Sequence, residues 1–284
     1  MNSRVPSTRR AFVGLYEHGR RDVKVQHRAY SADAHLEWGS VTKTVTAGLL
    51  KVLSIDGVLD LRTSVADLLP IPSLEHTSLQ ELTLHRAGLP PMHAGAPTGL
   101  VRDPSTGCDR TRFLSEIAPR ITVNEEISGK FNYSNLGYAL LGLALEEATG
   151  RSWFELVRTH LLPASRYPSL TTCPPLGSYP TTMGISRRPW QLGRGVYASA
   201  GGLWSRGDDL LRYAEDTSSM PPSPGWFVLR GGVLFHNGQT RDAGCSVMVD
   251  QRNGRASVAH TLFRMPRTPQ RLAEHALFGN GAHS

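Results

Sequence analysis

Two residues one helical turn apart, Ser40 and Lys43, could together attack a carbonyl group. They form the pattern Ser-x-x-Lys at the start of a predicted helix over 40–56. Positions i and i+3 lie on one face of a helix, so the amine of Lys43 can reach the hydroxyl of Ser40. A lysine whose pKa is lowered by burial can take the serine proton and make the hydroxyl nucleophilic. The spacing indicates nucleophilic catalysis, although a surface helix N-cap at Ser40 would give the same pattern.

Two later motifs carry polar groups that could join this pair. Tyr133-Ser134-Asn135 lies at the entrance of a predicted helix over 136–149, and His236-Asn237-Gly238 lies at the end of a predicted strand over 226–236. Phenol and imidazole groups can hold or move a proton near a serine nucleophile. Each motif also has a structural explanation: Tyr133 as a core aromatic, Asn135 as a helix N-cap, His236 as a strand-end residue and Asn237-Gly238 as a turn.

The order and surroundings of the three motifs resemble one known superfamily. The surrounding segments are Glu37-Trp38-Gly39 before Ser40, His85-Arg86-Ala87-Gly88-Leu89-Pro90, and Ser199-Ala200-Gly201-Gly202-Leu203-Trp204-Ser205. With them, the chain resembles the serine β-lactamase and penicillin-binding-protein superfamily. The branch it is most similar to is the class C β-lactamase-like one, with family VIII esterases, D-aminopeptidases and related acyltransferases. The resemblance extends over about residues 11–278.

The resemblance implies a role for each motif residue. Ser40 would be the acylated nucleophile and Lys43 its proton acceptor. Tyr133 would be the second member of the base system, as a phenolate stabilised by Lys43. Asn135 would orient Lys43 and the substrate.

The third motif would bind and orient the substrate through His236, Asn237 and Gly238. His236, where many relatives carry lysine, would hold Tyr133 and the leaving group, and Gly238 would leave room for the substrate backbone. The backbone N–H groups of Ser40 and Gln239 would form the oxyanion hole, where donors stabilise developing charge. No cofactor is implied, and the histidines show no metal-binding spacing.

The order of predicted elements indicates an α+β fold. Strands at both ends of the chain imply one β-lactamase-like antiparallel sheet flanked by terminal helices, with a mostly helical region inserted. The predicted strands are 11–17, 23–30, 226–236, 243–249 and 255–263. The other predicted helices are 79–85, 112–118, 152–162 with a Ser152/Glu155 capping box, 205–213 with a Ser205/Asp208 cap, and 268–278.

We expect a short flexible tail over 1–10 and one catalytic domain over 11–284. Within that domain, 11–56 and 199–284 would form the sheet-containing part and 57–198 the helical part. Proline, glycine and serine without periodicity indicate a long loop over 163–197.

Composition argues against several classes of protein. The net charge is +7, with 27 arginines and four lysines, but no basic run interleaves with aromatics, so we expect no nucleic-acid partner. Apolar stretches such as 139–145 are far too short to cross a membrane. Three widely spaced cysteines predict no disulfide framework. The first 21 residues lack the apolar core of a signal peptide, so we expect a cytoplasmic protein.

These observations favour a serine acyl-enzyme catalyst that takes an ester or amide donor. We expect it to pass the acyl group to an amine or alcohol acceptor, in specialised metabolite or antibiotic biosynthesis. A compact helical insertion would leave an open cleft at Ser40 for that second substrate. Simple hydrolysis by water is the first alternative, and a catalytically silent binding protein on the same fold is the second.

Overall fold

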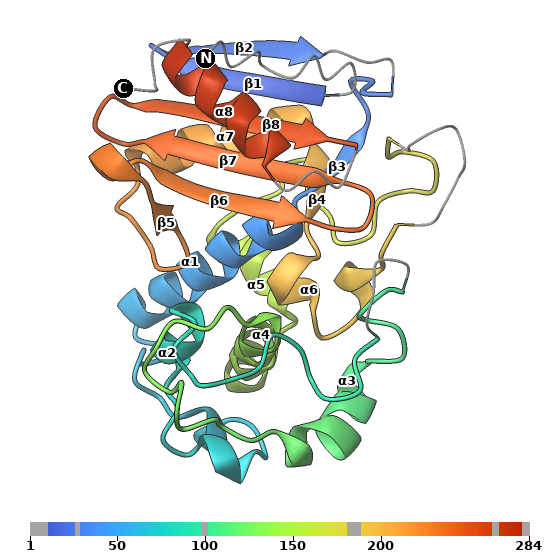
Figure 1. The fold of residues 1–284 in the computed structure, drawn as a ribbon, viewed down its shortest axis with the longest axis vertical. Coiled ribbons are helices and arrows are strands. Elements are labelled where there is room, and N and C mark those ends of the chain that lie inside the picture. The colour runs from blue at the N-terminus through green and yellow to red at the C-terminus, as the bar shows by residue number, and fades with distance from the viewer. Residues whose placement is uncertain (1–10, 26–28, 98–101, 181–188, 263–266, 280–284) are drawn as a thin grey trace.

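A six-stranded antiparallel sheet joins the two ends of the chain (Figure 1). The computed structural model describes residues 11–25, 29–97, 102–180, 189–262 and 267–279. The sheet order is β2-β1-β8-β7-β6-β5, so the first hairpin pairs directly with the last strand. This arrangement confirms the predicted α+β fold. The strands are β1 Ala11–Glu17, β2 Arg20–Val25, β5 Phe227–Val228, β6 Leu234–Gln239, β7 Gly244–Asp250 and β8 Arg255–Thr261.

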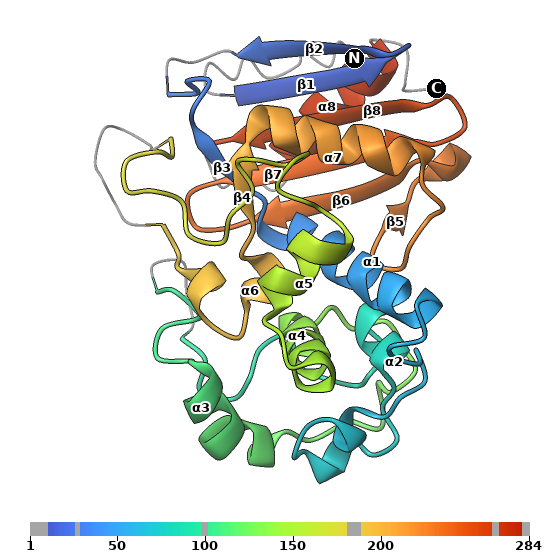
Figure 2. The ribbon, with the colours of Figure 1, turned by 180° about the vertical axis from the view of Figure 1, so that it is seen from behind.

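Helices cover both faces of the sheet. Helix α8 (Thr268–Phe278) lies on the face seen in Figure 1, where Leu272 and Leu277 pack with Met248 of β7. Helix α7 (Gly207–Ser219) lies on the opposite face, seen in Figure 2. Strand β7 contacts α8 on one face and α7 on the other, which is why every residue of β7 is buried.

The inserted region packs around helix α4 (Asn135–Thr149), in which every residue from Leu136 to Leu145 is buried. Helix α1 (Thr42–Ile55) lies between the sheet and this region (Figure 1) and follows a short 3-10 segment, η1 (Gly39–Val41). Strand β3 (His35–Glu37) comes just before η1 in the chain and pairs with β4 (Trp204–Arg206) in a separate two-stranded sheet. The remaining α-helices are α2 Leu79–Thr83, α3 Arg110–Arg112, α5 Trp153–His160 and α6 Ala198–Gly201.

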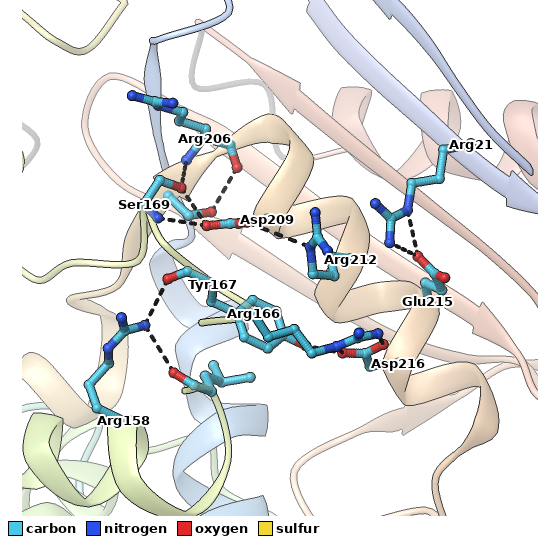
Figure 3. A network of polar contacts seen from close by, with 12 residues as sticks. Arg21, Arg158, Arg166, Tyr167, Ser169, Arg206, Asp209, Arg212, Glu215 and Asp216 are labelled. Atoms are coloured by element: carbon cyan, nitrogen blue, oxygen red, sulfur yellow. Dashed lines mark hydrogen bonds and ion pairs between the residues drawn. The ribbon is translucent and has the colours of Figure 1, made fainter. Parts of the chain in front are cut away.

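Polar contacts fasten the loop after α5 to helix α7 (Figure 3). Arg166 pairs with Asp216, whose carboxylate also accepts from Tyr167. The Asp209 carboxylate accepts from both the backbone N–H, at 2.8 Å, and the hydroxyl, at 2.6 Å, of Ser169. Because Asp209 is almost fully buried, these bonds fix the start of the segment that follows Ser169.

Arginines extend this network at both of its ends. Arg158 of α5 donates to the carbonyl of Tyr167 at 2.8 Å, and Arg21 of β2 pairs with Glu215 of α7 (Figure 3). The loop is thereby tied to α5, to α7 and, through α7, to the edge of the sheet.

Several predicted elements are confirmed. The helix over 268–278 has the predicted bounds, and the Ser152/Glu155 capping box begins α5. The predicted loop over 163–197 holds one 3-10 turn, Leu192–Arg194, among its described residues. The predicted strand over 23–30 instead begins at Arg20 and ends at Val25, and residues 29–30 are not part of a strand. The tail over 1–10 and residues 26–28 and 263 of two predicted strands lie outside the described residues.

Three predictions of local structure are wrong. Ser205 does not cap α7, because its hydroxyl accepts from the Trp38 indole at 2.9 Å. The strand over 226–236 is broken, because Gly231 and Gly232 take left-handed φ values of 82°. The helix over 112–118 is one π turn, Phe113–Ile117, between α3 and a 3-10 turn, Ala118–Arg120.

Candidate active site

The three sequence motifs meet where η1, the start of α4 and strand β6 come together. The Lys43 Nζ atom lies 3.1 Å from the Ser40 Oγ atom, as the i, i+3 spacing predicts. The same amine donates to Asn135 Oδ1 at 2.7 Å and to the carbonyl of Ala200 at 2.6 Å. Residues up to 157 positions away from Lys43 in sequence therefore contact its side-chain nitrogen.

Lys43 is completely buried, with 0% exposure. Its recorded polar partners are a hydroxyl, an amide and a carbonyl, and the described residues give it no carboxylate partner. Burial lowers the pKa of Lys43 to about 7, because the charged form loses its hydration. Near neutral pH a large share of the molecules thus carry the neutral amine, which can accept a proton.

Tyr133 precedes α4 and lies beside this amine, whose nitrogen is 5.1 Å from the centre of the phenol ring. Burial raises the pKa of Tyr133 to about 12, partly offset by a hydrogen bond with Ser40. Tyr133 is therefore a neutral phenol at physiological pH, and the expected phenolate is not supported. A phenol so placed can relay a proton between Ser40 and a leaving group.

The His85 ring packs against the Tyr133 ring, a contact that the sequence motifs did not predict. The two rings lie 4.4 Å apart, and His85 Nδ1 accepts from the backbone N–H of Ser134 at 3.0 Å. His85 adopts a left-handed φ of 56°, uncommon for a non-glycine residue. Its position in the His85-Arg86-Ala87-Gly88 segment is the only sequence signal that could have marked it.

His236 lies within β6 rather than at the end of a strand. It is buried, and burial together with the nearby Lys43 lowers its pKa to about 3, so the imidazole is neutral. Its Nδ1 atom lies 2.9 Å from the carbonyl of Asn237, and Nε2 has no hydrogen-bond partner among the described residues. With Nδ1 donating, Nε2 presents a free lone pair.

The next residues of β6 alternate between the two faces of the sheet. Asn237 donates to Gln270 of α8 at 2.8 Å, so the structure does not bring its side chain to Ser40. Gly238 lies directly against Trp38, and a Cβ atom there would be 1.9 Å from the Trp38 carbonyl oxygen. Only glycine fits this position, and the reason is packing against η1.

This close approach places the two expected oxyanion-hole amides together. The backbone nitrogen of Ser40 would be 3.1 Å from a Cβ on Gly238, and that of Gln239 would be 2.9 Å from one on Gly39. Ser40 also lies at the N-terminal end of the helical segment that continues into α1, where backbone N–H groups favour negative charge. The arrangement can stabilise an oxyanion bound to both amides.

A buried carboxyl group braces this part of the site. Glu37, three residues before Ser40, accepts from the Thr240 hydroxyl at 2.6 Å. Thr240 directly follows Gln239, so the bond connects the segments that carry the two amides. Burial raises the pKa of Glu37 to about 8, so its carboxyl group is mostly protonated at neutral pH.

The cavity beside Ser40 is small, at about 80 Å³. Its wall is mostly apolar, and Tyr133 and His236 are not part of it. The described residues thus give no support for the open cleft expected from the sequence. The lining residues are Gly39, Ser40, Met92, Pro104, Asn135, Trp190, Leu192, Tyr197, Ala200, Gly201 and Gln239.

Nowhere in the described ranges do three His, Cys, Asp or Glu side chains converge so that they could hold a metal ion. No helix there has the length and apolar character needed to cross a membrane.

Comparison with known families agrees with this geometry. The family model described as Beta-lactamase matches residues 7–261, which is most of the chain. The chain belongs to the β-lactamase family. A curated relative of this β-lactamase-family protein is a probable fimbrial assembly protein FimD of Dichelobacter nodosus, 29% identical over 126 residues. The match covers 43% of this chain and 31% of that protein, so it spans about a third of the relative's length.

Solved structures share the fold at low sequence identity. A class C β-lactamase superposes with a TM-score of 0.78 at 15% identity, covering 98% of this chain and 92% of the other. A D-stereospecific amidohydrolase from a Streptomyces species gives 0.76 at 17%, covering 96% and 94%. SurE, crystallised with D-Leu, gives 0.72 at 21%, covering 98% and 73%. These structures share their fold with this member of the β-lactamase family.

Proposed function

We propose that Ser40 forms a covalent acyl-enzyme with an ester or amide donor, with Lys43 as its base. One observation carries this proposal. A neutral lysine amine has two N–H bonds and one lone pair, and the two closest contacts of Nζ, Asn135 Oδ1 and the Ala200 carbonyl, are both acceptors. When the amine donates to both, its lone pair is left for the proton of the Ser40 hydroxyl, 3.1 Å away.

Ser40 Oγ forms a bond to the carbonyl carbon while its proton passes to Lys43, and the oxyanion is held by the Ser40 and Gln239 amides. Collapse of the tetrahedral intermediate breaks the C–O or C–N bond. The departing oxygen or nitrogen receives its proton from the Lys43 ammonium through the phenol of Tyr133. The neutral imidazole of His236 can accept from the leaving group on that side.

The second half of the proposal is transfer of the acyl group to an amine or alcohol. An acyl-enzyme reacts with whichever nucleophile is held near the carbonyl. None of the described residues that line the mostly apolar cavity carries a carboxylate, and an ordered water needs several polar partners to stay in place. This lining supports an organic acceptor over water. Hydrolysis remains the alternative, supported by the amidohydrolase and β-lactamases of the same fold.

We further propose a D-configured donor. One structural neighbour is described as D-stereospecific, and another was crystallised with D-Leu. An ester donor with D-Leu as its acyl part, compared with its L enantiomer, tests this point through the ratio of their kcat/KM values. The D ester is expected to be the better donor, and equal values would contradict the proposal.

A cytoplasmic role in specialised metabolite biosynthesis is also part of the proposal. Cys108, Cys173 and Cys245 are all free thiols, and free thiols suit a reducing compartment. Fractionation of cells that express the gene from its natural start should recover the protein with the cytosol. Recovery outside the cytosol would contradict this assignment.

Product partitioning tests transfer against hydrolysis. The donor ester is incubated with graded amines and alcohols, and transfer product is measured against free acid. Transfer predicts that product rises with acceptor concentration while free acid falls. Free acid as the sole product across a varied acceptor panel would make the protein a hydrolase. The silent-binding alternative predicts no turnover at all.

A further inference from the structure

We propose that a second cavity, beyond Trp190, binds the distal end of the donor's acyl group. The geometry points to an acyl group that ends in an aromatic ring or large apolar group bearing an anionic substituent. This inference rests on the proposed function, because it names the substrate class of the Ser40 site. The cavity is here called the Trp204 pocket, and it is formed chiefly by Cys173, Tyr179, Trp190, Gln191, Arg194 and Trp204.

The Trp204 pocket adjoins the Ser40 cavity. Trp190 lines both, so a group bound in one is next to the other. The pocket measures about 340 Å³ against about 80 Å³ beside Ser40. The smaller cavity has room for the atoms around the scissile bond, and the larger one for a ring and its substituents.

The position of the pocket assigns it to the acyl part of the donor. Tyr133 and His236, which serve the leaving group, line neither of the two cavities. The Ser40 cavity is instead walled by Asn135, Gly201 and Gln239. A group that extends from that cavity past Trp190 therefore stays attached to Ser40 after the leaving group departs.

The walls of the pocket suit a flat apolar group. Trp204 is buried at 5% exposure, and the ring of Tyr179 lies 5.8 Å from it. Offset or tilted aromatic pairs are favourable, and a ligand ring could add to this stack. Two backbone hydrogen bonds between Trp204 and Thr171, at 2.8 and 2.9 Å, hold the wall in place. The Trp204 wall of the pocket is thus held in place by the fold itself.

Arg194 supplies the charge. Its guanidinium has no hydrogen bond or ion pair recorded with the described residues, whereas Arg166 and Arg206 both pair with aspartates. The nearby carboxylate of Asp103 is already used, since it accepts from the backbone of Gln191 and from Ser105. A guanidinium in an aromatic-lined pocket binds carboxylates in a planar, two-bond geometry.

Cys173 makes the pocket directly measurable. It is the one exposed thiol among the three cysteines, since Cys108 and Cys245 are buried. In the inactive variant Ser40→Ala, the alkylation rate of Cys173 by iodoacetamide can be followed by mass spectrometry. We expect saturating 4-butylbenzoate to slow alkylation about fivefold or more, and the neutral 4-butylbenzamide to protect much less. Equal rates with and without 4-butylbenzoate would overturn the proposal.

Turnover gives an independent arm. Two p-nitrophenyl esters are compared, whose acyl chains end in a 4-carboxyphenyl or a neutral 4-carbamoylphenyl ring. We expect the ratio of their kcat/KM values to favour the acid and to fall about tenfold in Arg194→Gln, as for loss of one charge-assisted contact. The matched control Arg120→Gln, in a different cavity, should leave the ratio unchanged.

The alkylation and turnover experiments together distinguish failure of the Trp204 pocket from failure of the Ser40 chemistry. Turnover of the esters with no preference for the acid, in both the parent and Arg194→Gln, overturns the pocket and leaves the Ser40 chemistry standing. Protection of Cys173 by 4-butylbenzoate, with none of the esters turned over, supports the pocket and contradicts the proposed function.

Discussion

The Asn135 Oδ1 atom lies closer to Lys43 Nζ, at 2.7 Å, than the Ser40 Oγ atom does, at 3.1 Å. Asn135 therefore orients the amine rather than merely capping α4. The cap is provided by its neighbour Ser134, whose hydroxyl accepts from the N–H of Gly137 at 2.9 Å. The division of labour between adjacent residues leaves the amide of Asn135 free to act on Lys43.

Asn135→Asp tests this relationship through pH. The wild-type kcat/KM should rise with pH through about 7, because the neutral amine of Lys43 is the active form. A carboxylate at position 135 favours the ammonium, so it raises the pKa of Lys43 and moves this limb to higher pH. Activity should be low at pH 7 and partly return near pH 9. An unshifted limb would show that Lys43 is not the titrating base.

Lys43 and Tyr133 should behave as one coupled unit. Lys43→Ala and Tyr133→Phe should each lower kcat by roughly 10² or more, within the range of general acid–base catalysis. The double variant should lose much less than the sum of the two free-energy penalties, since both changes disable one proton transfer. Steady-state kinetics of the four proteins measures this. Fully additive losses would mean that the phenol acts independently of the amine.

Glu37→Ala should loosen the oxyanion hole without touching substrate. The bond from Thr240 to Glu37 joins the segments of Gln239 and Ser40, so its loss should lower kcat about tenfold with little change in KM. Glu37→Gln, which resembles the protonated acid and keeps an acceptor for Thr240, should restore most of the rate. Equal losses in the two variants would contradict the positioning role.

Buried histidines should make the fold sensitive to acid. Burial lowers the pKa values of His85, His236 and His260 to about 3. Between pH 6.5 and 3 the unfolded chain binds more protons at these sites, so stability falls as pH falls. Glu37, whose pKa is raised to about 8, opposes this trend with a single proton.

His260, in β8 and outside the active site, allows this to be measured. In His260→Gln, the slope of the unfolding free energy against pH should decrease by up to about 1.4 kcal/mol per pH unit between pH 6.5 and 4.5. Urea titrations of both proteins at several pH values give the two slopes. An unchanged slope would mean that folding leaves the pKa of His260 at its ordinary value, which would contradict the effect of burial.

The sequence predicted contacts that depend on local spacing better than those that depend on packing. Ser40 and Lys43 meet because three residues make nearly one helical turn, and the helix over 268–278 follows its apolar period. The Ala200 carbonyl on Lys43 and the Thr240 hydroxyl on Glu37 come from segments 157 and 203 residues away. A backbone carbonyl carries no sequence signal, so the first of these could not be predicted.

The wrong predictions have the same origin. The sequence around Ser205 is typical of a helix cap, but its hydroxyl instead accepts a hydrogen bond from the indole N–H of Trp38, 167 residues away. The predicted strand over 226–236 ends at His236, whereas the turn at Gly231-Gly232 delays the start of β6 to Leu234 and places His236 inside the strand. Asn237 shares a motif with His236 yet faces α8, since adjacent residues of a strand point to opposite faces.

Covalent labelling of Ser40 tests the central claim most directly. The protein is treated with a fluorophosphonate or an activated ester, its intact mass is measured, and the adduct is located by peptide mapping. We predict one adduct per chain, on Ser40, formed faster as pH rises through about 7, and absent in Ser40→Ala. An adduct on another residue, or unchanged turnover in Ser40→Ala, would contradict the account.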